Sequence, residues 1–442
     1  MRSSASLKLS SPRTIPPGYL MPFILVTSLF ALWGFANDIT NPMVAAFKSI
    51  LLISHFESSL VQAAFYGGYC FMAIPAALLI KRFSYKAGIL AGLTLYAAGC
   101  LLFIPSGHLM TFWAFLVAYF VMTCGLSFLE TSANPYILSM GDEATATRRL
   151  NLAQAFNPLG SITGMLIAKE FILARLDPAD EETRSVLSGT DPAAFAALQK
   201  ADLEIIIAPY TLLGGVVLLV LIVFALARLP AVAGEGDREL KVGATLRRLL
   251  KNRRYLEGVL AQAFYVGAQI MCWTFIIQYG VNELGMERAG AQGYNVIAMV
   301  IFVSSRFLCT YLLRFVSHGR LLGGLAAGAG ALLFGTIYLQ GMPGLYCLIG
   351  VSACMSLMFP TIYGIALDGL GDDAKLGSAG LILAIGGGCL LPPLQGAIMD
   401  GNGAMGLSAT RLSFFLPMIC FVVIAIYGYR TFRFHQEQEA SR

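Results

Sequence analysis

Charged residues are scarce in this chain, and their scarcity is its first informative feature. Asp, Glu, Lys and Arg make up 12% of the 442 residues, whereas 57% are hydrophobic. A soluble protein of this length carries about twice that charged fraction. The apolar segments recur along the whole chain, so the composition excludes an ordinary soluble domain and predicts a polytopic membrane protein.

The sequence also lacks the residue patterns of most enzyme classes. All nine cysteines fall inside apolar runs, which argues against a disulfide framework and against CxxC metal chemistry. No phosphate-binding loop, metal-ligand cluster or nucleophile–base pair is present. We therefore expect no enzyme activity, no cofactor, no metal and no nucleic-acid partner. The four histidines lie in expected loops or the tail, which excludes a histidine relay across the membrane: His55, His108, His318 and His435.

About twelve apolar runs are long enough to cross a bilayer. Backbone polar groups in lipid must be satisfied internally, and the alternating pattern of a barrel is absent, so the spans are helices. The predicted fold class is an all-α membrane protein with twelve transmembrane helices in two six-helix bundles. The expected spans are 19–49, 57–80, 86–106, 111–139, 148–174, 204–228, 255–282, 290–313, 320–340, 342–368, 376–399 and 409–431.

Lys and Arg gather in the segments on one side of these spans, which predicts that both termini are cytoplasmic. The expected units are a first bundle (1–228), a cytoplasmic linker (229–254), a second bundle (255–432) and a cytoplasmic tail (433–442). The linker and the residues after it contain LRRLLKNRRYLEG (246–258), basic and amphipathic, which we expect on the inner lipid surface; a regulatory role is the less favoured alternative. The acidic loop 176–204 is expected to be a solvated external connector.

An internal repeat supports the division into two bundles. AAGCLLF (97–103) resembles GAGALLF (328–334), and GDEA (141–144) resembles GDDA (371–374), at nearly equal offsets. The repeat length covers six spans, an even number, so both copies have the same orientation. That is the arrangement of two halves related by an axis along the membrane normal.

Glu130 is the first candidate functional residue. It follows Phe112 to Phe128, seventeen residues without a charge, and so lies well inside an apolar helix. A carboxylate there costs roughly 2.5–3.5 kcal/mol on insertion scales. Such a group faces water, finds a partner or takes up a proton. We favour a proton carrier over the alternative, a structural acid that joins two helices.

Asp38 is the second buried acid, in the first expected span. Asp38 and Asn41 are three residues apart, on one helical face. Pro42 removes a backbone hydrogen bond and is expected to kink the helix there. The alternative to a proton-coupling role is that Asp38 caps a broken helix segment.

Polar stripes mark further spans of the first half. Gln62, Tyr66 and Tyr69 share a face of the second span, and Glu130 and Asn134 are one turn apart in the fourth. In the fifth, amides recur at spacings of three and four, and a polar stripe on an apolar helix must face something polar. We favour lining of a solvated cavity over hydrogen bonds between helices. The stripe is Asn151, Gln154, Asn157 and Ser161.

The second half carries aromatic residues beside amides. Gln269, Trp273 and Tyr265 belong to one face of the seventh span, and Tyr363 follows Pro360 in the tenth. Aromatic rings stack on the C–H faces of a sugar while amides bind its hydroxyls. Without the amides these rings would be interpreted as core. Arg306 in the eighth span is expected either to line the cavity or to pair with a carbonyl or an acid.

These motifs together resemble one known family. The chain is similar to the fucose–galactose–glucose:proton symporters of the major facilitator superfamily, and most of all to bacterial L-fucose:proton symporters. The resemblance covers nearly all spans, and its most specific parts are LET-ANP and LNLAQ-FN. The matching segments are LWGFANDITNP (32–42), VQAAFYGGY (61–69), KRFSYKAG (81–88), GLSFLETSANPY (125–136), RRLNLAQAFNPLG (148–160), AQAFYVGAQIMCW (261–273) and FPTIYG (359–364).

The resemblance implies proton-linked acids in the first and fourth spans and a substrate amide pair in the fifth. Glu130 falls on the fourth-span acid, and Gln154 and Asn157 fall on the amides. The first span departs from the family, because Asn41 stands where the acid is expected and Asp38 lies one turn earlier. We expect Asp38 to supply the charge from the same face.

The sequence thus predicts a symporter that imports a monosaccharide, L-fucose or a related hexose, with protons by alternating access. Sodium remains open as the coupling ion, and so does the identity of the sugar. We expect a monomer in the bacterial inner membrane, surrounded by lipid. Two alternatives are a proton-driven drug or metabolite exporter, which would have a larger and more apolar cavity, and a non-transporting sugar sensor on the same fold.

Overall fold

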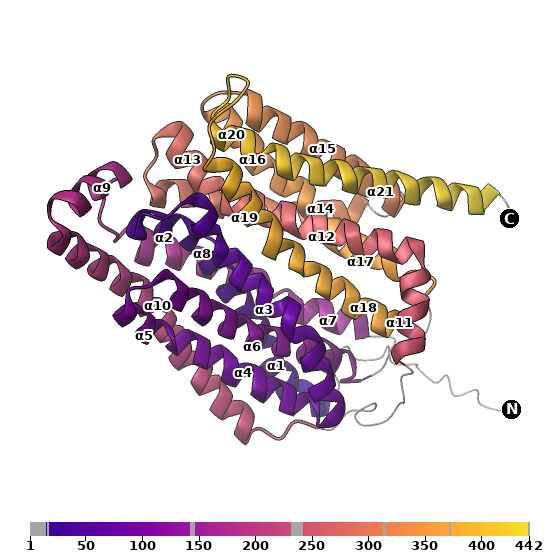
Figure 1. Cartoon of the computed structure of the whole chain (residues 1–442). Coiled ribbons are helices and arrows are strands. Elements are labelled where there is room, and N and C mark those ends of the chain that lie inside the picture. The colour runs from indigo at the N-terminus through magenta and orange to yellow at the C-terminus, as the bar shows by residue number, and fades with distance from the viewer. Residues whose placement is uncertain are drawn as a thin grey trace, which may run out of the picture.

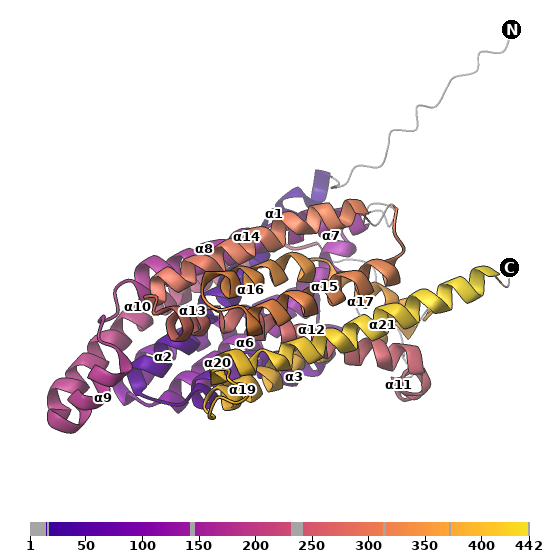
Figure 2. The same ribbon diagram turned by 90° about the horizontal axis from the view of Figure 1, so that it is seen from above.

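The computed structural model describes residue 15 and residues 17–141, 146–230, 242–312, 315–370 and 373–440. Helices dominate, and within these ranges the only β pairing is an isolated bridge between Ala404 and Leu407. The first and second bundles lie side by side in Figure 1, with α9 at one end of the molecule and α11 at the other. In Figure 2, seen from above, α9 and α11 again lie at opposite ends. We call these the α9 end and the α11 end.

The first bundle contains the six expected spans, several of them built from two or three consecutive helices. They are α1 (Leu20–Thr40) with α2 (Met43–Leu51), α3 (His55–Arg82), α4 (Tyr85–Leu101) with α5 (Phe103–Leu109), α6 (Phe112–Leu138), α7 (Ala146–Gln154) with α8 (Asn157–Ile167) and the π-helix η3 (Ala168–Leu173), and α10 (Pro192–Leu226).

The second bundle repeats this plan with six further spans, and the short helix α11 (Val242–Lys251) precedes it. The spans are α12 (Arg253–Thr274) with α13 (Ile276–Leu284), α14 (Arg288–Leu312), α15 (His318–Tyr338), α16 (Met342–Met355) with α17 (Met358–Leu367), α18 (Ala374–Leu383) with η5 (Ala384–Gly386) and α19 (Gly387–Met399), and α20 (Ala409–Ser413) with α21 (Phe415–Ala440).

Prolines explain several of the breaks within spans. The first span is interrupted at Asn41–Pro42, where the sequence predicts a kink. The fifth span was expected to be one helix over 148–174, and it is instead broken between Gln154 and Asn157. Pro158, in the first turn of α8, lacks a backbone N–H and disfavours a helical residue before it, so a new helix starts there. The break changes the predicted amide stripe, because its members lie on two helices.

The segment 176–204 differs from its prediction as a solvated connector. It contains α9 (Glu181–Thr190), and α10 already begins at Pro192. Arg184 and Asp202 form a fully buried ion pair at 2.6 Å, and Arg184 also donates to the carbonyls of Asp177 and Ala179. Because both charges are buried and hydrogen-bonded, this segment is a folded cap on the α9 end.

The contact of α1 with α8 positions the first-span acid. A Cβ at Gly34 would lie 2.1 Å from the Asn157 carbonyl oxygen, and one at Gly160 would lie 1.9 Å from that of Ala31. Small residues at such contacts let helix backbones approach closely in a membrane. The two helices therefore touch backbone to backbone, which brings Ser161 beside Asp38.

The predicted internal repeat is reflected in the packing. AAGCLLF lies in the third span, and α4 packs on α6 and α10; GAGALLF lies in the ninth, and α15 packs on α16 and α21. The third and ninth spans thus have equivalent neighbours in their own bundles. Residues 142–144 of GDEA and 371–372 of GDDA lie outside the described residues.

The two bundles meet along α3 and α19 and, on the other side, where α8 and η3 pack on α14. At the α9 end the Asp400 carboxylate accepts hydrogen bonds of 2.6 Å from the backbone N–H groups of His55 and Phe56, at the start of α3. A Cβ at Gly396 would lie 2.5 Å from the His55 carbonyl oxygen. An acid at a helix N-terminus is stabilised by the free N–H groups there, so this contact holds the bundles together at the α9 end.

Candidate functional site

Asp38 lies at the centre of a buried polar cluster between α1, α3 and α8. Its carboxylate accepts a hydrogen bond of 3.0 Å from the side-chain amide of Asn41, and Ser161 and Asn37 also bond to it. Asn41 in turn accepts a bond of 3.0 Å from Gln62. Asp38 and Asn41 are each 1% exposed, so the acid is enclosed by polar groups but is not opened to bulk water.

Asp38 and Asn41, the two candidates for the first-span polar group, therefore touch each other. The helix break at Pro42 ends α1 at Thr40 and leaves Asn41 as its C-cap residue. The N-cap of the following helix, α2, is Pro42, and no side chain caps it. Asp38 thus bonds sideways to Asn41 and Ser161 rather than to the free N–H groups of a helix start.

Glu130 lies on α6, half-buried, and one of its carboxylate oxygens is buried without a hydrogen-bond partner. Within the described residues neither Glu130 nor Asp38 belongs to an ion pair. Asn134, one turn later, donates to the Glu130 carbonyl at 3.1 Å and accepts from the Gln154 amide at 3.1 Å. A predicted sugar-binding amide is therefore tied to the turn that carries the acid.

Aromatic residues of α3 connect the surroundings of the two acids. Tyr66 donates to the Asn37 side chain at 3.1 Å and interacts electrostatically with Asp38. Its ring stacks on Tyr69 with centroids 6.4 Å apart, and Tyr69 interacts electrostatically with Glu130. As the spacing predicts, one face of α3 is polar, and it extends from one acid to the other.

The remaining amide of the fifth span bonds to the neighbouring helix. Asn157 donates to the Phe30 carbonyl of α1 at 3.3 Å, whereas the Gln154 side chain is exposed. The side chain of Asn151 lies outside the described residues. Within the described ranges no three His, Cys, Asp or Glu side chains gather as metal ligands would.

The candidates of the second bundle are held mostly by their own bundle. Trp273 donates its indole N–H to Ser352 at 3.1 Å, and Tyr265 donates to the Met355 carbonyl at 3.0 Å. Gln269 is half-buried, and Tyr363 stacks on Phe359 with centroids 6.3 Å apart. The bonds of Asp38, Asn41 and Tyr66 thus go to neighbours within the first bundle, and those of Trp273 and Tyr265 go to residues of the second.

Arg306 has the carbonyl partner that was one of its expected alternatives. Its Nε donates to the Ser356 carbonyl at 3.1 Å, at the break between α16 and α17. Its guanidinium lies 4.9 Å from the centroid of the Phe302 ring. Arg306 therefore fastens the eighth span to the tenth.

Sequence reasoning missed two residues of the site. Asn37 binds both Asp38 and Tyr66, and Thr274 of α12 accepts a 3.0 Å bond from Gln62. Asn37 had a detectable signal, since it lies four residues before Asn41 and shares its face. Thr274 had none, because a lone threonine in an apolar span does not indicate which residue of the other bundle it meets.

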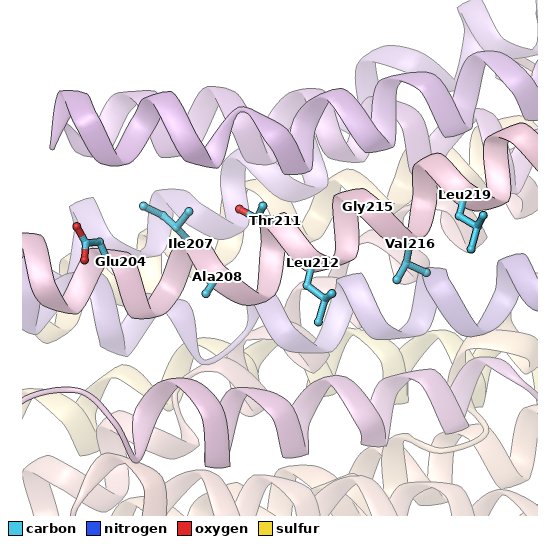
Figure 3. Close-up of a pocket in the computed structure, with 8 residues that line it drawn as sticks. All are labelled: Glu204, Ile207, Ala208, Thr211, Leu212, Gly215, Val216 and Leu219. Atoms are coloured by element: carbon cyan, nitrogen blue, oxygen red, sulfur yellow. The ribbon is translucent and has the colours of Figure 1, made fainter.

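A groove also runs along the outside of the first bundle, and Figure 3 shows its lining. All its lining residues belong to one helix, α10, and they are apolar apart from Glu204 at one end and Thr211. A groove of this composition has no set of polar groups to bind a sugar. We do not place the substrate site there.

Comparisons with known proteins agree with this architecture. Residues 26–389 match the Major Facilitator Superfamily. An L-fucose-proton symporter of Haemophilus influenzae is 53% identical over 417 residues, which cover 94% of this chain and 97% of that protein. An L-fucose-proton symporter of Escherichia coli is 37% identical over 415 residues, 93% of each chain.

A solved structure has the same fold. The crystal structure of the Major Facilitator Superfamily transporter FucP in the outward conformation is 36% identical, with a TM-score of 0.71, and the match covers 95% of this chain and 99% of that one. The twelve spans, the two bundles and the sequence match lead to one conclusion. The chain is a multi-pass membrane protein that belongs to the Major Facilitator Superfamily.

Proposed function

We propose that this protein is a proton-coupled symporter that carries a monosaccharide, L-fucose or a related hexose, by alternating access of its two bundles. The observation that carries the proposal is Glu130, an acid inside a membrane span that has no ion-pair partner within the described residues. Its main-chain carbonyl accepts from Asn134, which also accepts from Gln154. Relatives of high identity are L-fucose-proton symporters, and those relatives are transporters rather than enzymes.

Glu130 is proposed as the main proton carrier. An unpaired carboxylate inside a membrane protein is expensive, and binding a proton removes that cost. The partnerless oxygen leaves room for a proton that no hydrogen bond within the described residues competes for. Because Asn134 bonds both to the main-chain carbonyl of Glu130 and to Gln154, it holds the proposed proton carrier and the proposed sugar contact near each other.

Asp38 is proposed as the first-span charge, in place of Asn41. An amide does not titrate in the physiological range, so Asn41 cannot carry a proton for the cycle. Asp38 is buried and bonded to Asn41, at the place where the family acid is expected. Asn41 then transmits the charge state of Asp38 to Gln62.

Gln154 and Asn157 are proposed as the main sugar contacts, with Gln269 and Trp273 opposite. Gln154 is exposed, and within the described residues its amide oxygen accepts no hydrogen bond, so it is available to a hydroxyl group. Sugar binding by the second bundle requires Trp273 to offer its ring face, since its N–H is bound to Ser352. Further lining residues are Asn41, Asn134, Tyr66, Tyr265 and Tyr363.

We propose the bacterial inner membrane as the location, with the α11 end and both termini in the cytoplasm, and a monomer as the working unit. Residues 229–254 would form the linker and residues 433–442 the tail. Within the linker, residues 231–241 lie outside the described residues and α11 occupies 242–251. The helix α21 continues into the tail as far as Ala440. Leu246 and Leu250 of α11 are 47% and 58% exposed beside Arg247 and Lys251, which suits a lipid surface.

A panel of radiolabelled sugars tests this function in proteoliposomes that contain the purified protein. We expect L-fucose or a related hexose to accumulate when an inward proton gradient is imposed, and to equilibrate without it. If a sodium gradient alone drives accumulation, the coupling ion is sodium and not the proton. Sugar binding without counterflow would favour a sensor, and proton-driven extrusion of apolar compounds without sugar uptake would favour an exporter.

A further inference from the structure

A chain of hydrogen bonds leads from Asp38 across the boundary between the two bundles. Asn41 donates to Asp38 at 3.0 Å, and Gln62 donates both to Asn41 and to Thr274 of α12, each at 3.0 Å. All four side chains are at most 1% exposed. The first-span acid is therefore connected, without bulk water, to a residue of the opposite bundle.

The far end of this chain lies at a bend in the second bundle. Thr274 is the last residue of α12, and α13 continues at an angle of 42° after Phe275. Both N–H groups of the Gln62 amide are used, one for each bundle, while its carbonyl oxygen is buried without a partner. This amide therefore has one orientation in which it bridges Asn41 and Thr274 through donated hydrogen bonds.

We propose that Gln62 is a positioning residue that links the charge on Asp38 to the contact between the bundles at the α9 end. The inference rests on the proposed role of Asp38 in proton coupling. When Asp38 is charged, its carboxylate accepts a hydrogen bond from the Asn41 amide nitrogen. The Asn41 amide oxygen then faces Gln62. The Gln62 amide nitrogen donates both to that oxygen and to the Thr274 hydroxyl.

When the Asp38 oxygen that faces Asn41 binds a proton, this order is reversed. The carboxyl O–H can donate to the Asn41 oxygen, and Asn41 then presents its nitrogen to Gln62. Gln62 can then keep the bridge only if it turns its amide oxygen toward Asn41 and Thr274. In that orientation both N–H groups of the Gln62 amide are buried without a partner, whereas in the first orientation only its carbonyl oxygen lacks one. Buried donors without partners are unfavourable, so the protonated state weakens the bridge.

The direction of this effect suits a symporter. A proton-loaded carrier without sugar would favour opening at the α9 end, which the proposed topology places outside the cell. The carrier would wait there for the sugar and would not release the proton inside. Bound sugar would have to bring about closure at the α9 end while Asp38 keeps its proton, and the contact of Asp400 with the start of α3 would support the closed state. Release of the proton inside would then restore the bridge from the charged Asp38.

Asp38 is the group whose titration would make the Gln62 bridge depend on pH. Two other charged groups on elements packed near it interact elsewhere: Glu130 of α6 acts on Tyr69, and Lys48 of α2 pairs with Glu181. Within the described part of the chain, Tyr66 is the titratable side chain that interacts electrostatically with Asp38. The groups that face Asp38 are Asn37 and Asn41 of its own span, Tyr66 of α3 and Ser161 of α8.

Thr274→Val tests the inference, because it removes the far acceptor and keeps the side-chain shape and the bonds around Asp38. Thr274→Ser restores the hydroxyl. Thr361→Val is the matched control, since Thr361 is buried in the same bundle and, within the described residues, its hydroxyl bonds to the carbonyl of Leu357, the N-cap of its own helix α17. Spin labels at Leu109 and Met405, which are 64% and 78% exposed on the two bundles, report opening of the α9 end in full-length protein. The protein without labelling sites at Leu109 and Met405, treated with the same spin label, gives the background signal.

We expect the open fraction in the wild type to rise as the pH falls. In Thr274→Val the open fraction above neutral pH should rise by about twofold to tenfold, the worth of one net hydrogen bond, and depend less on pH. Thr274→Ser and Thr361→Val should follow the wild type. A Thr274→Val protein with the wild-type pH dependence would overturn the inference.

Asp38→Asn separates a failure here from a failure of the proposed function. If Asp38→Asn abolishes the pH dependence and Thr274→Val leaves it intact, the role of Gln62 is wrong and that of Asp38 stands. If Asp38→Asn keeps the pH dependence, the proposed role of Asp38 is wrong, and the inference about Gln62 falls with it.

Discussion

The two bundles share one architecture but differ in what their buried polar groups do. In the first bundle Asp38 and Glu130 lie within membrane spans, and Glu130 has an oxygen without a partner. In the second, the polar tips of Trp273 and Tyr265 are used for bonds inside the bundle, and Arg306 fastens two of its spans. The first bundle holds buried acids that can change charge, whereas Trp273, Tyr265 and Arg306 of the second make structural bonds. The second bundle also holds buried amides without a partner in the described residues, such as Gln262 and Gln278.

This difference teaches how a repeated fold can divide its work. If the proton carriers all belong to one bundle, the other can move as a rigid wall against it. The contact between them then needs only a few links that respond to charge, such as the one from Asp38 through Gln62 to Thr274. The following predictions test whether the division is real.

The largest effect is expected from Glu130→Gln, which keeps the shape of the side chain but cannot bind or release a proton. We expect accumulation of sugar in a proton gradient to fall to simple equilibration, while sugar exchange without a gradient continues. Glu257→Gln is the matched control from the second bundle, where Glu257 pairs with Arg253 and Arg430. Accumulation at the wild-type level in Glu130→Gln would refute the assignment.

A second prediction concerns the exchange of Asp38 and Asn41. Asp38→Asn should abolish or uncouple active transport, and Asn41→Asp alone should be tolerated. The two changes together should recover part of the activity, because the residues are bonded at 3.0 Å and either position can hold the charge. Uptake measured against pH in the three variants decides the matter. Normal transport in Asp38→Asn, with an unchanged pH profile, would leave Asp38 a structural role only.

A third, smaller effect should distinguish the amides of the fifth span. Alanine at Gln154 or Asn157 removes a hydrogen-bond partner of the sugar, which costs about 1–3 kcal/mol, or roughly tenfold to a hundredfold in affinity. Gln269→Ala tests the opposite wall, and the thermal unfolding of each variant controls for loss of structure. If Gln154→Ala and Asn157→Ala both bind the sugar normally, the site lies elsewhere.

The smallest effect is expected at the Arg248–Asp373 pair, outside the spans. The Arg248 guanidinium, 2.6 Å away, holds the pKa of Asp373 below its usual value of 3.8. Because the folded pKa is lowered, the stabilisation exists above the unfolded pKa and disappears as the pH falls through the folded value. Asp373→Asn should make α11 exchange its amide hydrogens faster at pH 7, while sugar transport stays within about twofold of the wild type. Unchanged exchange in α11 would show that the pair does not hold this helix.

Much of the fold could be predicted from the sequence because membrane spans obey simple rules. Among the described residues ten helices are long and apolar enough to span a membrane, or eleven with the bent pair α12 and α13, and the helix is interrupted at Pro42 as expected. The fifth expected span, which is broken into short helices, is not among them. The break of the fifth span at Pro158 and the folded cap around Arg184 and Asp202 were not predicted. A local proline effect was overlooked in the first case. In the second, polar residues far apart in the sequence pair only in the folded chain.

The site was predicted in its parts but not in its connections. The spacing correctly placed Gln62, Tyr66 and Tyr69 on one face of α3, because helical periodicity fixes neighbours on the same helix. It could not indicate that Asn134 bonds to Gln154 or that Gln62 reaches Thr274. Those contacts depend on how helices pack, and one sequence does not record the packing partner of each face.

The central claim is that the first bundle alone carries the coupled protons, and the movement of protons evoked by sugar tests it most directly. Proteoliposomes in a weakly buffered medium receive the transported sugar without an imposed gradient, and the external pH is recorded. We expect the medium to become alkaline with the wild type and with Glu257→Gln, but not with Glu130→Gln, which should still exchange labelled sugar. Alkalinisation of wild-type size in Glu130→Gln, or its loss in Glu257→Gln, would contradict the account.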